Sequence, residues 1–193
     1  MGNHEKGFLP NFGPNDGSIY FKLNDADYRN FIPQINALAS LLEINIPVSI
    51  DDESFEDEFW FTSKLNISKK KSIEVHKGKK SYENGGYLQV FDSESSSLLK
   101  TPLLKFRAAQ NDLLNLDIWY KGINVLKDAG SYSYNTDEKT SMLFNGISGH
   151  NTFSLNGKNH MLKGPRFTWL FKPRMLAAEL SEDEFEYKMQ ASM

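Results

Sequence analysis

The sequence predicts a mainly β protein, an antiparallel β-sandwich that is incomplete and preceded by a short helical linker segment. From about residue 72 onward, short apolar runs alternate with turn residues about every ten positions, as in sandwiches and barrels. Before that point, apolar residues recur at helical spacing. The 193 residues are 39% hydrophobic and 24% charged, which is typical of a globular protein. We therefore expect a linker over residues 1–66 and a sandwich over 67–193.

The linker is expected to be helical over about 25–43, with a break near Pro33. Asn24 and Asp25 are suitable N-caps, and Pro33 suits the first turn of a second helix. Four apolar residues would share one side of that helix: Ile35, Leu38, Leu41 and Leu42. After an acidic stretch at 51–58, the cluster Phe59-Trp60-Phe61 is expected to anchor the linker onto the next unit. The lysines between 69 and 80 are interpreted as solvated faces and strand-edge protection.

Beyond residue 72 we expect strands and no further helix. In the strand at 112–120, Leu116 and Ile118 should point inward, because side chains alternate with a period of two. Asn156-Gly157 predicts a type I′ hairpin turn, in which both central residues need positive φ. The predicted strands are 73–76, 86–91, 97–106, 112–120, 123–128, 150–156, 159–163 and 166–171.

The C-terminal tail, from Glu179 to Met193, is acidic and stands where further strands would be needed. A sandwich ending there would expose unpaired strand edges. We therefore expect the chain to be a fragment that depends on a partner.

Composition excludes several functional classes. With 22 Lys+Arg against 25 Asp+Glu and a net charge of −3, a broad phosphate-binding surface is not indicated, so we expect no nucleic-acid partner. The absence of cysteine removes disulfides, thiol catalysis and thiolate metal sites. No apolar run approaches the ~20 residues of a membrane span, and the first residues do not read as a signal peptide.

Asp128 and His150 are the candidate metal ligands. Asp128 ends a predicted strand before a glycine, and His150 enters the next strand after a glycine. Delivered from adjacent strand ends, the two side chains could share a divalent metal such as zinc. Alternatively, Asp128 caps a turn and His150 bonds to a backbone carbonyl.

Tyr132 and Tyr134 are candidates for substrate binding, because aromatic residues two positions apart can form a sugar-stacking platform. Alternatively, a Tyr hydroxyl can act in proton transfer. Arg107 could hold a carboxylate with two parallel hydrogen bonds. The alternatives are core packing for the tyrosines and a solvated or paired arginine. Trp119 and Trp169 are expected in the core.

Taken in order, several motifs resemble the C-terminal domain of the heparinase II/III family, and an earlier segment resembles the part that links its two domains. Each motif alone is weak, but their succession is specific. The motifs lie at residues 107–122, 128–135, 150–152 and 164–170, and the linker-like segments lie at 11–17 and 27–29.

The resemblance implies a polysaccharide lyase that cleaves uronic-acid-containing polymers by β-elimination, with a helical (α/α) toroid before the β-sandwich. The toroid would supply the catalytic Asn, His and Tyr, and this chain has no room for it. The resemblance also implies an acidic polysaccharide as substrate, the toroid half as partner, and a periplasmic or cell-envelope location.

Position by position, the resemblance makes Asp128 and His150 two ligands of a metal, often zinc. The third falls near Gln110, where alginate-degrading members carry an HxH pattern and this chain has Ala108-Ala109-Gln110.

The leading hypothesis is therefore the sandwich portion of a polysaccharide lyase, inactive without its toroid. The alternatives are a carbohydrate-binding module, with Tyr132, Tyr134 and Arg107 on an anionic glycan, or a structural domain that braces the toroid.

Overall fold

The computed structural model describes residues 22–44, 55–63, 77–101, 103–104, 108–133, 135–165, 168–183 and 187–193. They fall into two compact units, the first containing the described residues up to 63 and the second those from 77 onward. The predicted boundary between 66 and 67 and the predicted strand 73–76 lie outside the described residues, as do Lys69-Lys70-Lys71. No helix among the described residues has the length and apolar character needed to cross a bilayer.

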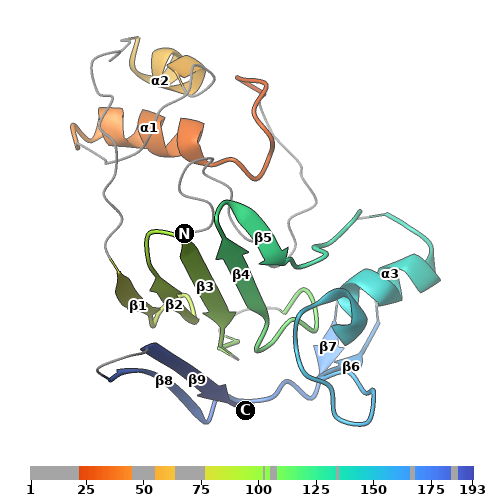
Figure 1. Ribbon diagram of the computed structural model, residues 1–193. Helices are drawn as coiled ribbons and strands as arrows, with labels where there is room; N and C mark the ends of the chain where they lie inside the picture. Colours follow the sequence, from red (N-terminus) through yellow and green to blue (C-terminus); the bar gives the residue numbers. More distant parts are fainter. Residues whose placement is uncertain are drawn as a thin grey trace. The chain divides into compact units, whose positions relative to one another are not determined.

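The first unit is a pair of packed helices, α1 (Ile32–Leu41) and α2 (Phe55–Thr62) (Figure 1). Helix α1 begins with Pro33 in its first turn, next to Asn30, whose Oδ1 accepts the N–H of Ile32 at 3.1 Å. The predicted helical stretch before Pro33 is wrong. Asn24 Oδ1 there accepts the N–H of Ala26 at 2.8 Å, so it stabilises a turn and not a helix.

The second unit is built on a five-stranded antiparallel sheet in which strands follow one another in chain order (Figure 1). Two further two-stranded antiparallel sheets complete it. The predicted mainly β, antiparallel fold is therefore confirmed. The large sheet consists of β1 (Gly78–Tyr82), β2 (Tyr87–Phe91), β3 (Ser95–Lys100), β4 (Leu116–Tyr120) and β5 (Ile123–Leu126), and the small sheets are β6 (Leu162–Lys163) with β7 (Trp169–Leu170) and β8 (Ala177–Glu182) with β9 (Tyr187–Ser192).

The prediction that Leu116 and Ile118 point inward is wrong. In β4 the alternate residues Asp117 and Trp119 are buried, at 1% and 8% exposure. Asp117 can be buried because its Oδ2 accepts a hydrogen bond from Asn124 Nδ2 at 3.1 Å. The two-residue period of the strand was therefore predicted correctly. The assumption that apolar residues are the buried ones assigned the wrong face of the strand to the interior.

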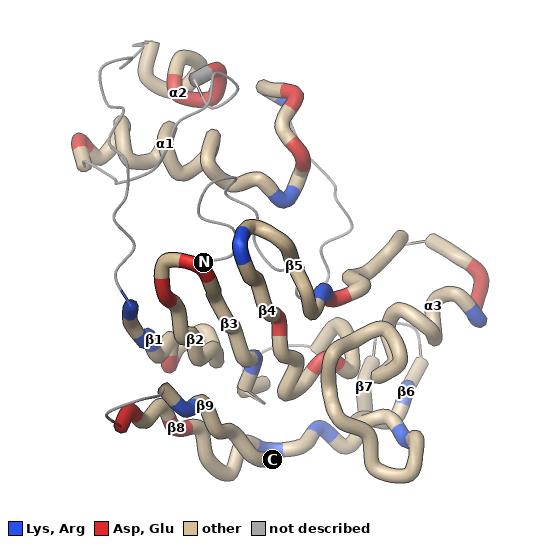
Figure 2. Tube along the Cα trace, viewed as in Figure 1, with Lys and Arg blue, Asp and Glu red and all other residues tan. Residues whose placement is uncertain are grey.

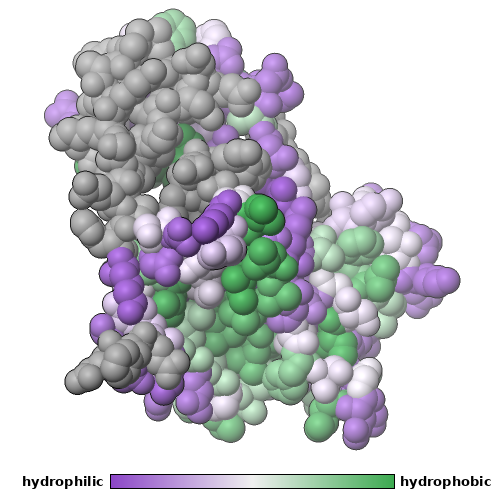
Figure 3. Space-filling view, in the orientation of Figure 1, coloured by the Kyte–Doolittle hydropathy of each residue, from purple (hydrophilic) through white to green (hydrophobic). Residues whose placement is uncertain are grey.

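Apolar side chains remain on the opposite face of the sheet. Figure 3 shows a hydrophobic area over β4 and β5 on the face in view. Tyr120 pairs with Ile123 across these strands, and the two side chains are 47% and 66% exposed.

The Asn156-Gly157 turn is confirmed. Both residues have positive φ, 54° and 67°, and Leu155 and Lys158 form an antiparallel bridge around them. The flanking residues 150–154 are not a strand, however, so the predicted strand 150–156 is wrong.

Several elements of the second unit were not predicted, among them strand β1, helix α3 and the hairpin β8–β9. Helix α3 (Glu138–Asn145) begins at Asp137, whose Oδ1 accepts the N–H of Thr140 at 2.9 Å, so the expectation of no further helix is wrong. The acidic tail, predicted to leave the sandwich short of strands, forms the hairpin β8–β9, which contacts β1 and β2. Its Glu182 pairs with Lys79 of β1 at 2.9 Å, so acidic residues are compatible with strands here.

The main described apolar cluster consists of Ala108, Met161 and Trp169, with Leu104 packed against it. The indole of Trp169 donates to the carbonyl of Ala109 at 3.0 Å. Both tryptophans predicted in the core, Trp119 and Trp169, are buried.

Candidate functional site

A polar loop after β3 organises the region around the candidate site. Asn111 is fully buried; its Oδ1 accepts the N–H of Met161 at 2.7 Å and its Nδ2 donates to the carbonyl of Asn145 at 3.3 Å. Asn115, also fully buried, accepts the N–H of Asn151 at 2.7 Å. The loop thus joins the end of α3, the segment around 151 and the segment around 161 through side chain to backbone bonds.

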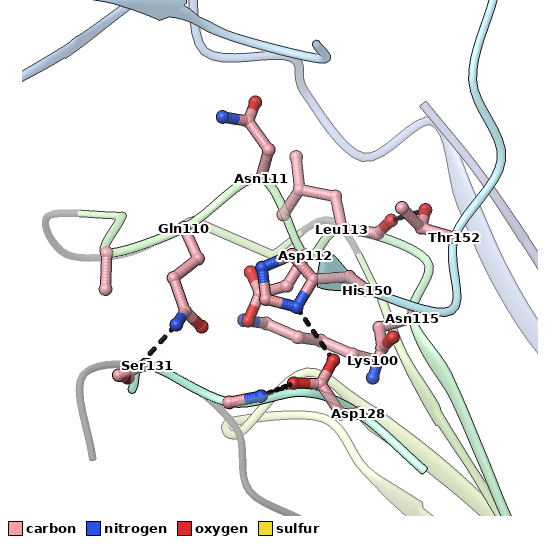
Figure 4. Close-up of polar contacts among 12 residues, drawn as sticks. Lys100, Gln110, Asn111, Asp112, Leu113, Asn115, Asp128, Ser131, His150 and Thr152 are labelled. Atoms are coloured by element: carbon pink, nitrogen blue, oxygen red, sulfur yellow. Dashed lines mark hydrogen bonds and ion pairs between the residues drawn. The ribbon is translucent and has the colours of Figure 1, made fainter. Parts of the chain in front are cut away.

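Asp128 and His150 meet inside this framework. Asp128 Oδ2 lies 2.8 Å from His150 Nδ1, and the two side chains are 1% and 0% exposed (Figure 4). The other carboxylate oxygen of Asp128 accepts the N–H of Gly130 at 2.7 Å. A further bond, from the N–H of Ala129 to the carbonyl of Gly149 at 3.1 Å, ties the two segments together. The sequence predicted these two residues at adjacent strand ends, and the structure brings them into contact.

A glycine is required beside His150. The short 3-10 turn η2 (Ile147–Gly149) delivers the histidine, and a Cβ atom on Gly149 would lie 2.9 Å from the carbonyl oxygen of Leu143. This distance is too short for a side chain against backbone. The turn therefore depends on glycine for close packing against α3.

Gln110 completes the group. Its side chain is buried, at 1% exposure, and its Nε2 donates to Ser131 Oγ at 3.0 Å. Its Oε1 is buried with no hydrogen-bond partner, and so is Nε2 of His150. Because a carboxylate only accepts, the 2.8 Å contact makes His150 Nδ1 the donor, and Nε2 of a neutral ring is then an acceptor. Two buried acceptor atoms thus lack a donor.

One of these acceptors is an imidazole nitrogen and the other an amide oxygen, and both are atom types that can bind a divalent cation. Imidazole nitrogen suits zinc, whereas amide and carboxylate oxygens suit harder cations. Among the described residues, no three His, Cys, Asp or Glu side chains gather as a metal site, so a cation here would need a ligand of another type, such as the amide oxygen of Gln110. In that arrangement Asp128 would hold the ring of His150 in place through Nδ1, as carboxylates do around metal-bound histidines.

An ion pair lies next to this group. Lys100 Nζ lies 2.5 Å from Asp112 Oδ2, with side-chain exposures of 15% and 4% (Figure 4). Burial, together with the nearby Asp112 carboxylate, raises the pKa of Tyr87. This pair was not predicted from the sequence, because its members are twelve positions apart and no motif connects them.

Of the three predicted substrate-binding residues, only Tyr132 is among the described residues; Arg107 and Tyr134 lie outside them. Tyr132 is 63% exposed, which contradicts the core-packing alternative for this residue. Its ring stacks on Phe144 of α3, with 5.0 Å between centroids and 17° between planes. Phe144 was missed because α3 itself was not predicted.

The chain is similar to solved heparinase structures. One heparinase III has 18% identity and a TM-score of 0.51, with 79% of this chain and 22% of that one covered. The same protein with methylated lysines has 16% identity and a TM-score of 0.52, covering 90% and 24%. The heparan sulfate lyase HepC from Pedobacter heparinus has 21% identity, a TM-score of 0.49, and coverage of 93% and 24%.

This chain thus spans less than a quarter of the length of these structures. No curated protein matches it in sequence. The model of the heparinase II/III-like C-terminal domain matches residues 74–187, which is more than half of the chain. The chain therefore belongs to the heparinase II/III-like family, and the match to the C-terminal domain of that family covers most of the second unit.

Proposed function

We propose that this chain is the β-sandwich portion of a polysaccharide lyase that acts on uronic-acid-containing polymers by β-elimination. The family match over 74–187 is the observation that carries the proposal. The acid and base would come from a helical toroid half, and the sandwich would brace it. The complete burial of Asp128 and His150 supports this division, because a side chain without exposed surface cannot reach a polymer.

The chemistry explains why a second part is needed. A base must remove the C5 proton beside the uronate carboxylate, a positive or hydrogen-bonding group must stabilise the enolate, and an acid must protonate the leaving oxygen. The exposed Tyr132 could contact a sugar ring. A stacking aromatic ring alone, however, neither removes the C5 proton nor stabilises the enolate. We infer that the enzyme works in the periplasm or cell envelope, where such polymers lie.

Co-expression with a helical toroid half, taken from the coding sequence adjacent to that of this chain, tests the proposal. The readout is the ultraviolet absorbance of unsaturated uronate released from heparan sulfate and other uronic-acid polymers. We expect absorbance from the pair and none from either half. Absorbance from this chain alone would contradict the assignment of acid and base to the toroid, and none from the pair would contradict the lyase function.

We further propose that Gln110 Oε1 and His150 Nε2 hold a divalent cation, with Asp128 orienting the ring of His150 through Nδ1. Bound there, the cation would act as a cross-link between the segments around 110, 128 and 150, and the buried acceptors Gln110 Oε1 and His150 Nε2 support this role. A ligand that binds only the folded state raises the melting temperature. We expect zinc or calcium to raise it, chelator to lower it, and His150→Gln to abolish both responses; metal analysis of the purified chain gives the occupancy directly.

Tyr132 supports a second candidate function, contact with a glycan. An exposed aromatic ring already held by stacking on Phe144 loses little conformational freedom on binding. We expect Tyr132→Ala to weaken binding of heparan sulfate to the chain in calorimetry, with Tyr120→Ala, exposed at 47% on the sheet, as the matched control.

A further inference from the structure

Three Asn-Gly steps lie among the described residues: Asn84-Gly85, Asn145-Gly146 and Asn156-Gly157. An asparagine before a glycine carries an intrinsic reactivity, because glycine has no Cβ atom to hinder the approach of its backbone nitrogen to the asparagine side chain. Whether the reaction proceeds in a folded chain depends on how firmly the fold holds that N–H and the side-chain amide. The three steps differ in this respect.

The step Asn145-Gly146, at the end of α3, is held on both sides of the reacting bond. The N–H of Gly146 donates to the carbonyl of Met142 at 2.9 Å, and Nδ2 of Asn145 donates to Ser141 Oγ at 2.9 Å. The nitrogen cannot attack until its hydrogen bond has opened, so these bonds lower the population of reactive conformers.

The step Asn84-Gly85, in the turn between β1 and β2, is held by the backbone. The N–H of Gly85 donates to the carbonyl of Tyr82 at 3.0 Å, and the N–H of Gly86 donates to the same carbonyl at 2.8 Å. Here, too, the attacking nitrogen is engaged in the folded chain.

The step Asn156-Gly157 forms the tip of the hairpin turn, and both residues are exposed. Among the described residues, neither the N–H of Gly157 nor the side chain of Asn156 has a hydrogen-bond partner. A Cβ atom on Gly157 would meet nothing within 4 Å, so the space around its backbone is open. Both reacting groups are therefore free at this step.

The tip is also weakly anchored. Leu155 and Lys158 form an isolated antiparallel bridge beside it, outside any strand. Leu155 and Phe153 are 74% and 51% exposed, so little buried apolar surface opposes local opening. The reaction needs a rotation of the Asn156 backbone away from its turn conformation, at a φ of 54°, and a tip with so few contacts can make that rotation.

We propose that Asn156 is a site of spontaneous deamidation in the folded chain, with water as the co-reactant. The nitrogen of Gly157 attacks Cγ of Asn156. The N–Cγ bond forms, the Cγ–Nδ2 bond breaks, and ammonia leaves with the proton of the glycine N–H. Water then opens the cyclic imide at either carbonyl, which gives aspartate or isoaspartate. This inference goes beyond the proposed lyase function, because it needs no substrate, metal or toroid.

Either product adds one negative charge, so the formal net charge of the chain changes from −3 to −4. The segment between α3 and β6 contains no Asp or Glu (Figure 2). The modification therefore introduces a charge of a sign that this segment otherwise lacks, and ion-exchange chromatography can separate the modified chain.

The base of the hairpin is docked by bonds that do not involve the tip. Asn159 Oδ1 accepts the N–H of Ile147 at 3.0 Å, and Asn111 Oδ1 accepts the N–H of Met161 at 2.7 Å. We therefore expect the modified chain to stay folded, with a melting temperature close to that of the unmodified chain.

Incubation of the full chain at mildly alkaline pH, followed by peptide mapping with mass spectrometry, tests the proposal. Chymotryptic cleavage after Phe144 and Phe153 places Asn145 and Asn156 on different peptides. We expect Asn156 to convert at least about tenfold faster than Asn145 or Asn84, because the glycine N–H at each of those steps must first lose its hydrogen bond.

Two controls separate the effect of the fold from that of the sequence. Unfolding in urea removes the hydrogen bonds at all three steps, so their rates should converge there. Asn156→Gln keeps an amide at the tip, but its longer side chain would have to close a larger and less favourable ring. This variant should lack the acidic species that the wild type develops.

Equal rates at the three steps in the folded chain would overturn the proposal. Absence of conversion at Asn156 in the folded chain, whatever happens in urea, would overturn it as well, because the turn would then protect its own tip. Acidic species that develop equally in Asn156→Gln would place the modification elsewhere, with the same consequence.

Discussion

The helix pair α1–α2 and the region around Asn111 and His150 both bury polar side chains, but with different structural consequences. Around Asn111, buried amides bond to backbone groups of distant segments and lie next to an apolar cluster that contains Met161 and Trp169. In the helix pair, buried carboxylates bond to side chains of the same unit, while Leu38 and Leu42 of α1 are more than half exposed. Around Asn111, buried polar groups hold distant segments of the fold together. In the helix pair, they leave apolar side chains exposed on the outside.

This difference predicts that removing a buried polar group costs most near His150. Asp128→Ala should lower the free energy of unfolding by about 3–5 kcal/mol, because it leaves His150 Nδ1 and the N–H of Gly130 without their partner in a dry interior. Urea unfolding measures the change. Asp25→Ala, which removes a carboxylate whose side chain is 91% exposed, is the control and should leave the midpoint in place. Equal midpoints for the two variants would refute the cross-linking role.

Asn111→Ala should have the next largest effect, about 2–4 kcal/mol, because the N–H of Met161 and the carbonyl of Asn145 each lose a buried partner. The same urea unfolding experiment applies. Asn135→Ala, at an exposed position, controls for the amide itself. A small effect at Asn111 would mean that water replaces the amide, and the contrast between the two regions would weaken.

In the helix pair, Asp57→Ala should cost less, about 1–2 kcal/mol, because its partner Asn24 is only half-buried and its partner Gln34 is exposed, so both can turn toward water. Hydrogen exchange of the amides of α1 and α2 measures this local stability. Glu56→Ala, on the exposed side of the same helix, should leave exchange unchanged. A loss of protection that spreads to β2–β4 would show that the two regions are not energetically separate.

The smallest effect concerns pH. Burial and the Asp112 carboxylate raise the pKa of Tyr87 above its ordinary value of 10.0. The folded state therefore favours the neutral phenol, and this contribution to stability is complete below pH 10.0 and is lost as the pH rises through the folded-state pKa. Thermal melts between neutral and strongly alkaline pH should show a decline that is shallower in Tyr87→Phe. Parallel declines in the two proteins would count against a raised pKa at Tyr87.

Local rules predicted what depends on near neighbours in sequence. The Asn156-Gly157 turn was predicted because positive φ at two successive residues selects these residue types. The strand period around Leu116 and the apolar stripe from Ile35 to Leu42 were also visible as patterns. Motif succession led to the heparinase II/III family, which the match over 74–187 bears out.

Which face of each strand or helix is buried could not be predicted from near neighbours in sequence. Leu116 and Ile118 were assigned inward because apolar residues are usually buried, yet Asp117 is the buried neighbour, and Asn124 on the adjacent strand donates to one of its carboxylate oxygens. The same argument applies to Asp57, whose partner Gln34 lies 23 residues away.

By itself, then, the sequence determined the mainly antiparallel β class, the turn at Asn156, the family, and the pairing candidates Asp128 and His150. Only the tertiary structure decided that those two side chains touch in a fully buried setting, that Gln110 leaves an unpartnered oxygen beside them, and that the apolar stripe of α1 faces outward. The physical reason is that periodicity and turn chemistry are local, whereas burial of a polar group depends on a partner brought from a distant part of the chain.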